Sequence, residues 1–280
     1  MKYKIKIKLL CVDIDGTLLD SDKRVPKINK EAIQYAVQKN VIVAIATGRS
    51  VNGMQYLFKE LGVTEENAIC LNGGLVLCKG KIIYKSCMDE HIVSKIVDIV
   101  EKYQSQIFLS TAQFNITNAE VSADLKKQLA NGSLKSNQRF CKNYDELREN
   151  AEKYKELIIK AAIKETDEKS YYKIRQELLQ TGLVEAEKSD THYVDIIEKN
   201  SGKGRGVETL AAHLQIPMSE VMCIGDNEND RTMIETAGVG VAMGNAVNEV
   251  KKAAQYITSD NNSGGVAQAI YHFISEDKSE

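Results

Sequence analysis

The stretch Asp13-Ile14-Asp15-Gly16-Thr17 follows directly on the strand-like run IKIKLLCV at residues 5–12. Side chains two positions apart on an extended segment point to the same face, so we expect the two acids to lie together. The glycine permits a tight turn, and the threonine adds a hydroxyl group beside it. Paired acids at the end of an apolar strand are costly to bury unless a metal ion or a proton transfer uses them. The stretch therefore predicts a catalytic centre.

The composition of the chain limits the kinds of protein it can be. With 280 residues, of which 43% are hydrophobic, the chain can form one large domain or two modest ones with a real core. A formal net charge of -2 does not favour binding to nucleic acid or to an anionic membrane. We find no signal-like segment and no apolar run of membrane-spanning length. The partner is therefore expected to be neither nucleic acid nor a membrane.

The cysteines indicate the compartment. The chain has six cysteines and no CxxC pair, and none of the spacings is typical of a zinc site. We interpret all six as reduced thiols, which predicts a cytoplasmic protein.

The first third of the chain alternates strand and helix. A helix is expected at 27–39, with Ile28, Ala32, Ile33, Ala36 and Val37 on its apolar face. The continuous apolar run at 41–46 is typical of a strand buried on both faces of a parallel sheet, and it ends in TGRS. Two short apolar runs at 75–78 and 81–84 flank Lys79-Gly80, which predicts a β-hairpin.

Residues 86–189 differ in pattern from the rest of the chain. Charged amphipathic helices at 89–103, 123–130 and 167–180 alternate with strands at 106–110, 157–163 and 183–187. The segment contains two glycines, at 132 and 182, and no long linker. We interpret it as a compact inserted α+β domain.

The last third resumes the pattern of the first third, with strands expected at 192–197, 221–224 and 256–258 and helices between them. Alternation on both sides of the insert predicts one parallel sheet built from both ends of the chain. The expected fold class is therefore α/β, with a Rossmann-like parallel sheet, helices on both faces and an inserted α+β domain. The expected core domain covers residues 1–85 and 190–280, and the insert covers residues 86–189.

Three of the predicted strands carry polar groups at their carboxyl ends. The groups are the first acidic pair, Thr47-Gly48 after the second strand, and GDNEND at 225–230 after a late strand. Ligands of open α/β sheets bind beyond these ends, so the three segments should meet. Carboxylates prefer hard cations such as Mg²⁺, whereas hydroxyl, amide and lysine groups donate to phosphate. These are the components of phosphoryl transfer through an aspartate.

The ordered motifs resemble those of the haloacid dehalogenase superfamily of phosphotransferases. They are DIDGT at 13–17, ATGR at 46–49, GKG at 202–204 and GDNEND at 225–230. Together with the insert they are similar to the Cof-type branch, which is subclass IIB and carries a C2 cap. The resemblance implies a Mg²⁺-dependent phosphatase acting on a small phosphorylated metabolite such as a sugar phosphate, with the insert as the substrate-specificity cap.

The resemblance also implies catalytic roles for four residues. Asp13 would attack phosphorus and form an aspartyl-phosphate. Asp15 would protonate the leaving group and then activate water. Thr47 would hold the phosphoryl group, and Lys203 would neutralise charge between the nucleophile and the phosphate.

Further residues are implied as ligands. The phosphate would be bound by Ile14, Thr47, Gly48, Lys203 and Asn229. The metal would be bound by Asp13, Asp15, Asp226 and Asp230, with Asp15 contributing its backbone carbonyl. Asp230 could instead orient the lysine.

Several alternatives stay open at this point. A phosphomutase uses a similar active site, and a regulator could bind a phosphorylated metabolite without turnover. The segment Asn72-Gly73-Gly74 could be a plain turn, or its asparagine could face the crevice. Arg49 could reach a phosphate or pair with an acid. The chain could be a monomer or a small homo-oligomer, and its substrate is not named by these residues.

Overall fold

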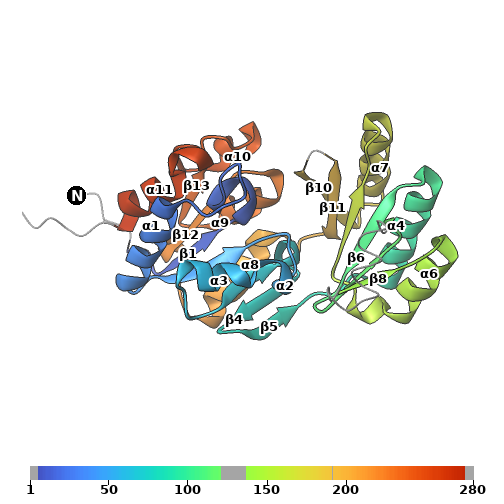
Figure 1. Ribbon diagram of the computed structural model, residues 1–280, viewed down its shortest axis with the longest axis horizontal. Coiled ribbons are helices and arrows are strands. Elements are labelled where there is room, and N and C mark those ends of the chain that lie inside the picture. Colours follow the sequence, from blue (N-terminus) through green and yellow to red (C-terminus); the bar gives the residue numbers. More distant parts are fainter. Residues whose placement is uncertain (1–5, 121–136, 191, 275–280) are drawn as a thin grey trace, which may run out of the picture. The chain divides into compact units, whose positions relative to one another are not determined.

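The computed structural model describes residues 6–120, 137–190 and 192–274 (Figure 1). The chain divides into two compact units. The first combines Met1–Lys85 with Ser201–Glu280, and the second is the inserted Ser86–Asn200. The helix expected at 123–130 lies outside the described residues.

The first unit is built on a mixed sheet of eight strands. Their order is β14 (Tyr256–Ile257), β13 (Val239–Ala242), β12 (Val221–Gly225), β1 (Leu9–Val12), β2 (Ile42–Ala46), β3 (Asn67–Cys70), β4 (Leu75–Cys78) and β5 (Lys81–Lys85). The strands from β14 to β3 are parallel, and β4 and β5 are antiparallel. The sheet therefore joins both ends of the chain, as the sequence predicts.

Apolar side chains explain why these strands lie at the centre. All four residues of β1 are buried, as expected for a parallel strand covered on both faces. The expected hairpin is confirmed between β4 and β5. Its turn residues Lys79 and Gly80 have φ values of 51° and 74°, which matches the left-handed conformation of a tight hairpin turn.

Helices lie on both sides of this sheet (Figure 1), which is the predicted α/β class. They are α1 (Lys27–Gln38), α2 (Val51–Met54), α3 (Tyr56–Leu61), α8 (Lys203–His213), α9 (Arg231–Thr236), α10 (Asn248–Ala253) and α11 (Gly265–Ile274). Helix α1 packs against α11 and α3, whereas α8 packs against α9, which in turn contacts α10.

The buried face of α1 is rotated from the predicted one. The sequence predicts Ile28 and Val37 inside, but they are 50% and 40% exposed, whereas Asn29 is fully buried. The amide of Asn29 donates to the carbonyl of Leu18 at 3.2 Å and accepts from the backbone N–H of Ala267 at 3.2 Å. These bonds satisfy the buried amide and tie α1 to the loop after β1 and to α11.

The inserted unit has its own six-stranded sheet. Its order is β10 (Val184–Asp190), β11 (Tyr193–Glu198), β9 (Lys160–Lys164), β6 (Gln106–Ser110), β7 (Asn115–Thr117) and β8 (Gln138–Phe140). The accompanying helices are α4 (Glu90–Tyr103), α6 (Tyr144–Lys153) and α7 (Glu168–Gln180). Alternate residues of its strands, such as Ile107, Leu109, Ala161 and Ile163, form a separate hydrophobic core.

The chain returns to the first unit later than the sequence indicates. The sequence predicts the strand at 192–197 as part of the core domain, but β11 pairs antiparallel with β9 and β10 of the inserted sheet. The return therefore comes at Ser201 rather than at residue 190. The hydrophobic pattern identifies a strand but does not name its partners.

Two further observations concern membrane-spanning helices and the cysteines. Within the described ranges, no helix is both long and apolar enough to span a membrane. All six cysteines are free thiols, and all but Cys87 are buried.

Candidate active site

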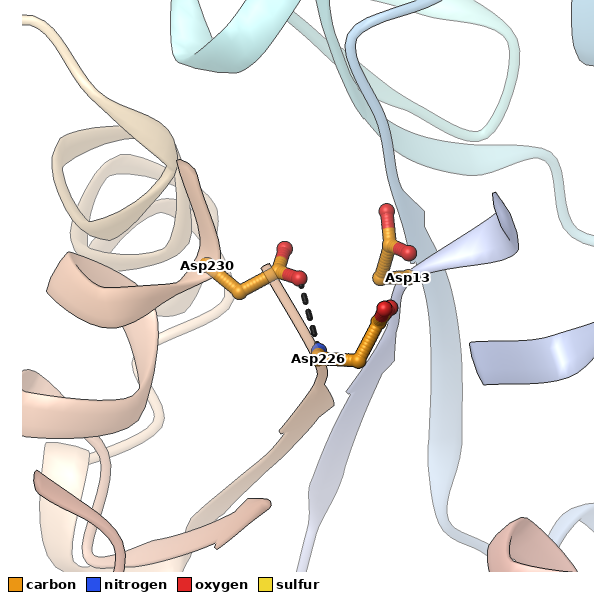
Figure 2. A group of neighbouring side chains, drawn as sticks. All are labelled: Asp13, Asp226 and Asp230. Atoms are coloured by element: carbon orange, nitrogen blue, oxygen red, sulfur yellow. Dashed lines mark hydrogen bonds between the residues drawn. The ribbon is translucent and has the colours of Figure 1, made fainter. Parts of the chain in front are cut away.

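Three aspartates meet at the carboxyl ends of two neighbouring parallel strands. Asp13 follows β1, Asp226 follows β12, and Asp230 lies in the helical turn after Asp226 (Figure 2). Strands β1 and β12 pair with Val12 opposite Ile224, and the N–H of Asp13 donates to the carbonyl of Ile224 at 3.0 Å. One carboxylate oxygen from each aspartate lies within 4.8 Å of the others. The register of the two strands thus brings together acids more than 200 positions apart.

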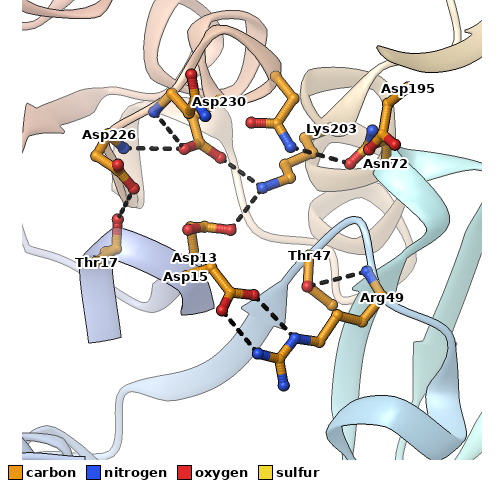
Figure 3. A network of polar contacts seen from close by, with 12 residues as sticks. Asp13, Asp15, Thr17, Thr47, Arg49, Asn72, Asp195, Lys203, Asp226 and Asp230 are labelled. Atoms are coloured by element: carbon orange, nitrogen blue, oxygen red, sulfur yellow. Dashed lines mark hydrogen bonds and ion pairs between the residues drawn. The ribbon is translucent and has the colours of Figure 1, made fainter. Parts of the chain in front are cut away.

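A buried lysine neutralises part of this charge. Lys203 is the first residue of α8 and is fully buried. Its Nζ atom lies 2.7 Å from Oδ1 of Asp13 and 2.6 Å from Oδ1 of Asp230 (Figure 3). Burial alone would lower the pKa of this amine, but the two carboxylates outweigh burial and raise it. The lysine is therefore held as a cation between the two acids.

Asp230 also fixes the loop that carries Asp226. Its Oδ2 atom accepts from the backbone N–H groups of Asp226 and Asn227, at 2.9 and 3.0 Å. A side chain at Gly225 would place its Cβ 2.5 Å from that of Asp230, so only glycine fits there. With its oxygens engaged by Lys203 and the loop, Asp230 is placed to orient the lysine, one of the two roles considered for it.

The turn after Asp13 positions Asp226. The hydroxyl of Thr17 donates to Oδ1 of Asp226 at 2.7 Å. Gly16 has a φ of 83°, and a Cβ on it would lie 2.4 Å from Oδ2 of the same carboxylate. Glycine is required here by both backbone conformation and space. The sequence does not predict this role of Thr17, because it does not show which distant group faces the hydroxyl.

The acidic cluster carries more negative than positive charge. Burial and then the charge of Asp230 raise the pKa of Asp13 well above its usual range, although Lys203 opposes this rise. The same two causes raise the pKa of Asp226 to about 7. Three carboxylates facing one ammonium group favour a further cation. Clustered carboxylate oxygens are hard donors of the kind that Mg²⁺ prefers, so the donor set fits this ion.

Asp15 lies apart from this cluster and is paired with an arginine. Its oxygens accept from Nε and Nη2 of Arg49 at 2.8 and 2.7 Å (Figure 3). Nζ of Lys23 lies 3.2 Å from Oδ1 of the same carboxylate. Burial would raise the pKa of Asp15, but the hydrogen bonds and charge of Arg49 and then Lys23 lower it. Arg49 therefore pairs with an acid, one of its two predicted roles. The metal contact predicted for Asp15 uses its backbone carbonyl, which this pairing leaves untouched.

The loop after β2 carries two of the predicted phosphate ligands, Thr47 and Gly48. Thr47 is buried, and its Oγ1 accepts from the backbone N–H of Arg49 at 3.1 Å. Gly48 lies between them, and Ile14 is buried between the two acids of the first motif.

The buried amide of Asn229 donates from Nδ2 to Oδ1 of Asn72 at 3.2 Å. Asn72 thus faces the interior, where the sequence left its role open.

Comparisons with known proteins identify the family of the chain. A family model for haloacid dehalogenase-like hydrolases matches residues 10–270. Two Bacillus subtilis relatives are similar over 96% of this chain. Phosphatase YwpJ is 27% identical and is covered over 100% of its length. The phosphatase YwtE, named for 5-amino-6-(5-phospho-D-ribitylamino)uracil, is 28% identical and is covered over 99% of its length.

A solved structure shows the same fold. The subclass IIB sugar phosphatase BT4131 superposes with a TM-score of 0.78 at 25% identity, covering 95% of this chain and 98% of its own. The family model, the phosphatase relatives and this structural likeness agree with the motifs at the ends of β1, β2 and β12. The chain belongs to the haloacid dehalogenase-like hydrolases and is a phosphatase of their Cof-type branch.

Proposed function

We propose that this protein is a Mg²⁺-dependent phosphatase that hydrolyses a small phosphorylated metabolite through an aspartyl-phosphate intermediate. The observation that carries the proposal is the buried Lys203 bridging Asp13 and Asp230, with the carboxylate of Asp226 beside them. A cation held against a carboxylate suits a nucleophile that must approach an anionic phosphate.

Asp13, Asp226 and the backbone carbonyl of Asp15 would hold the Mg²⁺ ion, with Asp230 beside them. When bound, the ion supplies positive charge that stabilises phosphoryl oxygens. The excess carboxylate charge of the cluster supports this assignment.

In the proposed first step, an oxygen of Asp13 attacks phosphorus. A bond forms between this oxygen and phosphorus, and the bond from phosphorus to the ester oxygen breaks. Asp15 gives its proton to the departing oxygen, so the alcohol leaves neutral. Lys203 offsets the charge that develops between Asp13 and the phosphoryl group.

In the second step, Asp15 takes a proton from water, whose oxygen attacks phosphorus and frees Asp13. The ion pair with Arg49 favours the ionised form of Asp15, which is the form that this step requires. Proton donation in the first step requires this pairing to weaken when substrate binds. We propose that Thr47, Gly48, Asn229 and the N–H of Ile14 hold the phosphoryl oxygens throughout.

The proposed substrate is a sugar phosphate or a related monoester. The relatives support this choice, because their names give a sugar phosphatase and a phosphatase for a phosphorylated ribityl compound. We propose that residues 86–200 act as the cap that selects the substrate. We also propose that the protein is cytoplasmic, is a monomer or small homo-oligomer, and binds neither nucleic acid nor a membrane. Its six free cysteines support the cytoplasmic location.

The test is release of inorganic phosphate from p-nitrophenyl phosphate, with Mg²⁺ and with EDTA. We expect release only with Mg²⁺, and a loss of about 10⁴-fold or more in Asp13→Asn, which keeps the shape of the side chain. Asp22→Asn, a change at an exposed acid of the following loop, serves as the control and should keep full activity. Undiminished hydrolysis by folded Asp13→Asn would overturn the mechanism.

A screen of phosphorylated metabolites, read as kcat/KM, would then identify the substrate. Product analysis separates hydrolysis from mutase activity. Free phosphate supports the proposal, whereas an isomerised sugar phosphate without release of phosphate would identify a mutase.

A further inference from the structure

Three consecutive residues after β3 adopt a left-handed backbone. Leu71, Asn72 and Gly73 have φ values of 51°, 54° and 96°, and all three are buried. Leucine rarely adopts this conformation, and such strain persists only where the surroundings fix the chain. We call residues 71–73 the left-handed arc.

The arc is held between two segments of the candidate site. The N–H of Leu71 donates to the carbonyl of Arg49, and the N–H of Asn72 donates to that of Thr47, both at 3.1 Å. A Cβ on Gly73 would lie 2.2 Å from the carbonyl oxygen of Gly202, directly before Lys203. The arc thus contacts both the loop of Thr47 and the start of α8.

The side chain of Asn72 reaches a third segment of the site. It is fully buried, and its Oδ1 atom accepts from Nδ2 of Asn229 at 3.2 Å. An amide nitrogen carries two hydrogens, so this bond uses one and leaves the second for another acceptor. The acceptor on Asn72 also selects the orientation of the Asn229 amide, because a flipped amide would bring two oxygens together.

We propose that Asn72 is a positioning residue that acts through Asn229, holding its amide so that the second N–H faces the phosphoryl group. This rests on the proposed function, in which Asn229 contacts phosphate. The arc fixes Asn72 relative to Thr47 and Lys203, so three phosphate-binding segments share one rigid neighbour.

A plain turn would need only the backbone conformation of residue 72. Glycine adopts positive φ without strain, so Asn72→Gly keeps the arc and removes only the side chain. Asn72→Ala removes the same amide but strains the backbone. Comparing the two variants separates a role of the amide from a role of the turn.

The experiment measures inhibition by inorganic phosphate in Asn72→Gly, Asn229→Ala and the double variant, all with Mg²⁺. We expect Ki for phosphate to rise about five- to tenfold in each single variant, the range typical of one lost hydrogen bond. If Asn72 acts through Asn229, the double variant should be no worse than Asn229→Ala. The melting temperature should fall further in Asn72→Ala than in Asn72→Gly, because both lose the buried amide and only alanine strains the backbone.

An unchanged Ki in Asn72→Gly would overturn the inference, as would losses that multiply in the double variant. Failure of the proposed function looks different, because wild-type protein would then release no phosphate. In that case, the rise in melting temperature caused by 10 mM phosphate replaces Ki as the readout. A rise in wild type that both single variants lose supports the inference, and equal shifts in all proteins, or none in wild type, overturn it.

Discussion

Lys203 in the first unit and Lys160 in the inserted unit are both buried against aspartate, at 2.7 Å from Asp13 and 2.6 Å from Asp195. Lys160 and Asp195 form a pair of opposite charges on neighbouring strands β9 and β11. Lys203 instead lies between two carboxylates, with that of Asp226 close by. The pair of Lys160 and Asp195 balances its charge within the protein. The cluster around Lys203 leaves negative charge in excess, which favours binding of a further cation that can offset the charge of a reacting phosphate.

Of the changes that test this comparison, the one at Lys203 is expected to have the largest effect. Lys203→Met keeps the length of the side chain but removes the cation between Asp13 and Asp230, so stabilisation of the developing charge is lost. We expect kcat/KM for p-nitrophenyl phosphate to fall about 10³-fold. Mg²⁺ should still bind, because the carboxylates remain, and titration of melting temperature against Mg²⁺ measures this. Turnover within tenfold of wild type would show that the buried cation is not used in the reaction.

Changes to Lys160 and Asp195 in the inserted unit should alter stability rather than catalysis. Lys160→Met leaves the carboxylate of Asp195 buried without its cation and should destabilise the inserted unit by about 3 kcal/mol. Combining it with Asp195→Leu should restore most of this loss, because an apolar pair can replace a buried ion pair. Urea unfolding followed by circular dichroism measures both.

A double variant no more stable than Lys160→Met would contradict the interpretation of Lys160 and Asp195 as a pair that apolar residues can replace. The two lysines would then differ in more than charge balance.

The excess charge of Asp13, Asp226 and Asp230 predicts a pH dependence of stability. The pKa of Asp226 is raised to about 7, so below that pH the folded protein keeps a proton that the unfolded chain loses near its ordinary value of about 3.9. Stability without metal should therefore fall as pH rises from 5 to 8. Asp226→Asn should remove about 2 kcal/mol of this fall. Urea midpoints in EDTA at both pH values measure it, with Asp22→Asn as the control.

If the free energy of unfolding of Asp226→Asn falls with pH as steeply as that of wild type, groups other than Asp226 cause the pH dependence. Added Mg²⁺ should reduce the slope in wild type, because a bound cation favours the ionised acids.

How far the sequence predicts the molecule depends on whether a feature is local. Apolar runs ending in acids predict the parallel sheet and the edge where Asp13 and Asp226 meet, because parallel strands share that edge. Partners across the fold are not local. Thr17 facing Asp226, Asn72 facing Asn229, and the pairing of Lys160 with Asp195 all depend on registers between distant segments.

The same limit explains the two differences in the fold. The run at β11 identifies a strand, but joining either sheet would satisfy its pattern, so the predicted boundary lies too close to the N-terminus. The predicted face of α1 is confirmed at Ala32, Ile33 and Ala36 and wrong at Ile28 and Val37. Asn29 is buried instead, because Leu18 and Ala267 satisfy its amide, which no periodicity shows.

The smallest effect is expected at Arg49, which contrasts with the two lysines because its acid is half-exposed. Arg49→Lys keeps the charge but loses the two-pronged contact with Asp15, so the pKa of that carboxyl should rise toward its ordinary range. The water step needs ionised Asp15, so the acid limb of kcat against pH should move upward. Activity at pH 4 relative to pH 7.5 should therefore fall, by at most about twofold if the pKa reaches its ordinary value of about 3.9. Lys23→Met is the matched control. Its amine also contacts Asp15 but is 67% exposed, so its loss should change this ratio less than Arg49→Lys does. Equal changes in both variants would contradict a special role of the two-pronged contact between Arg49 and Asp15.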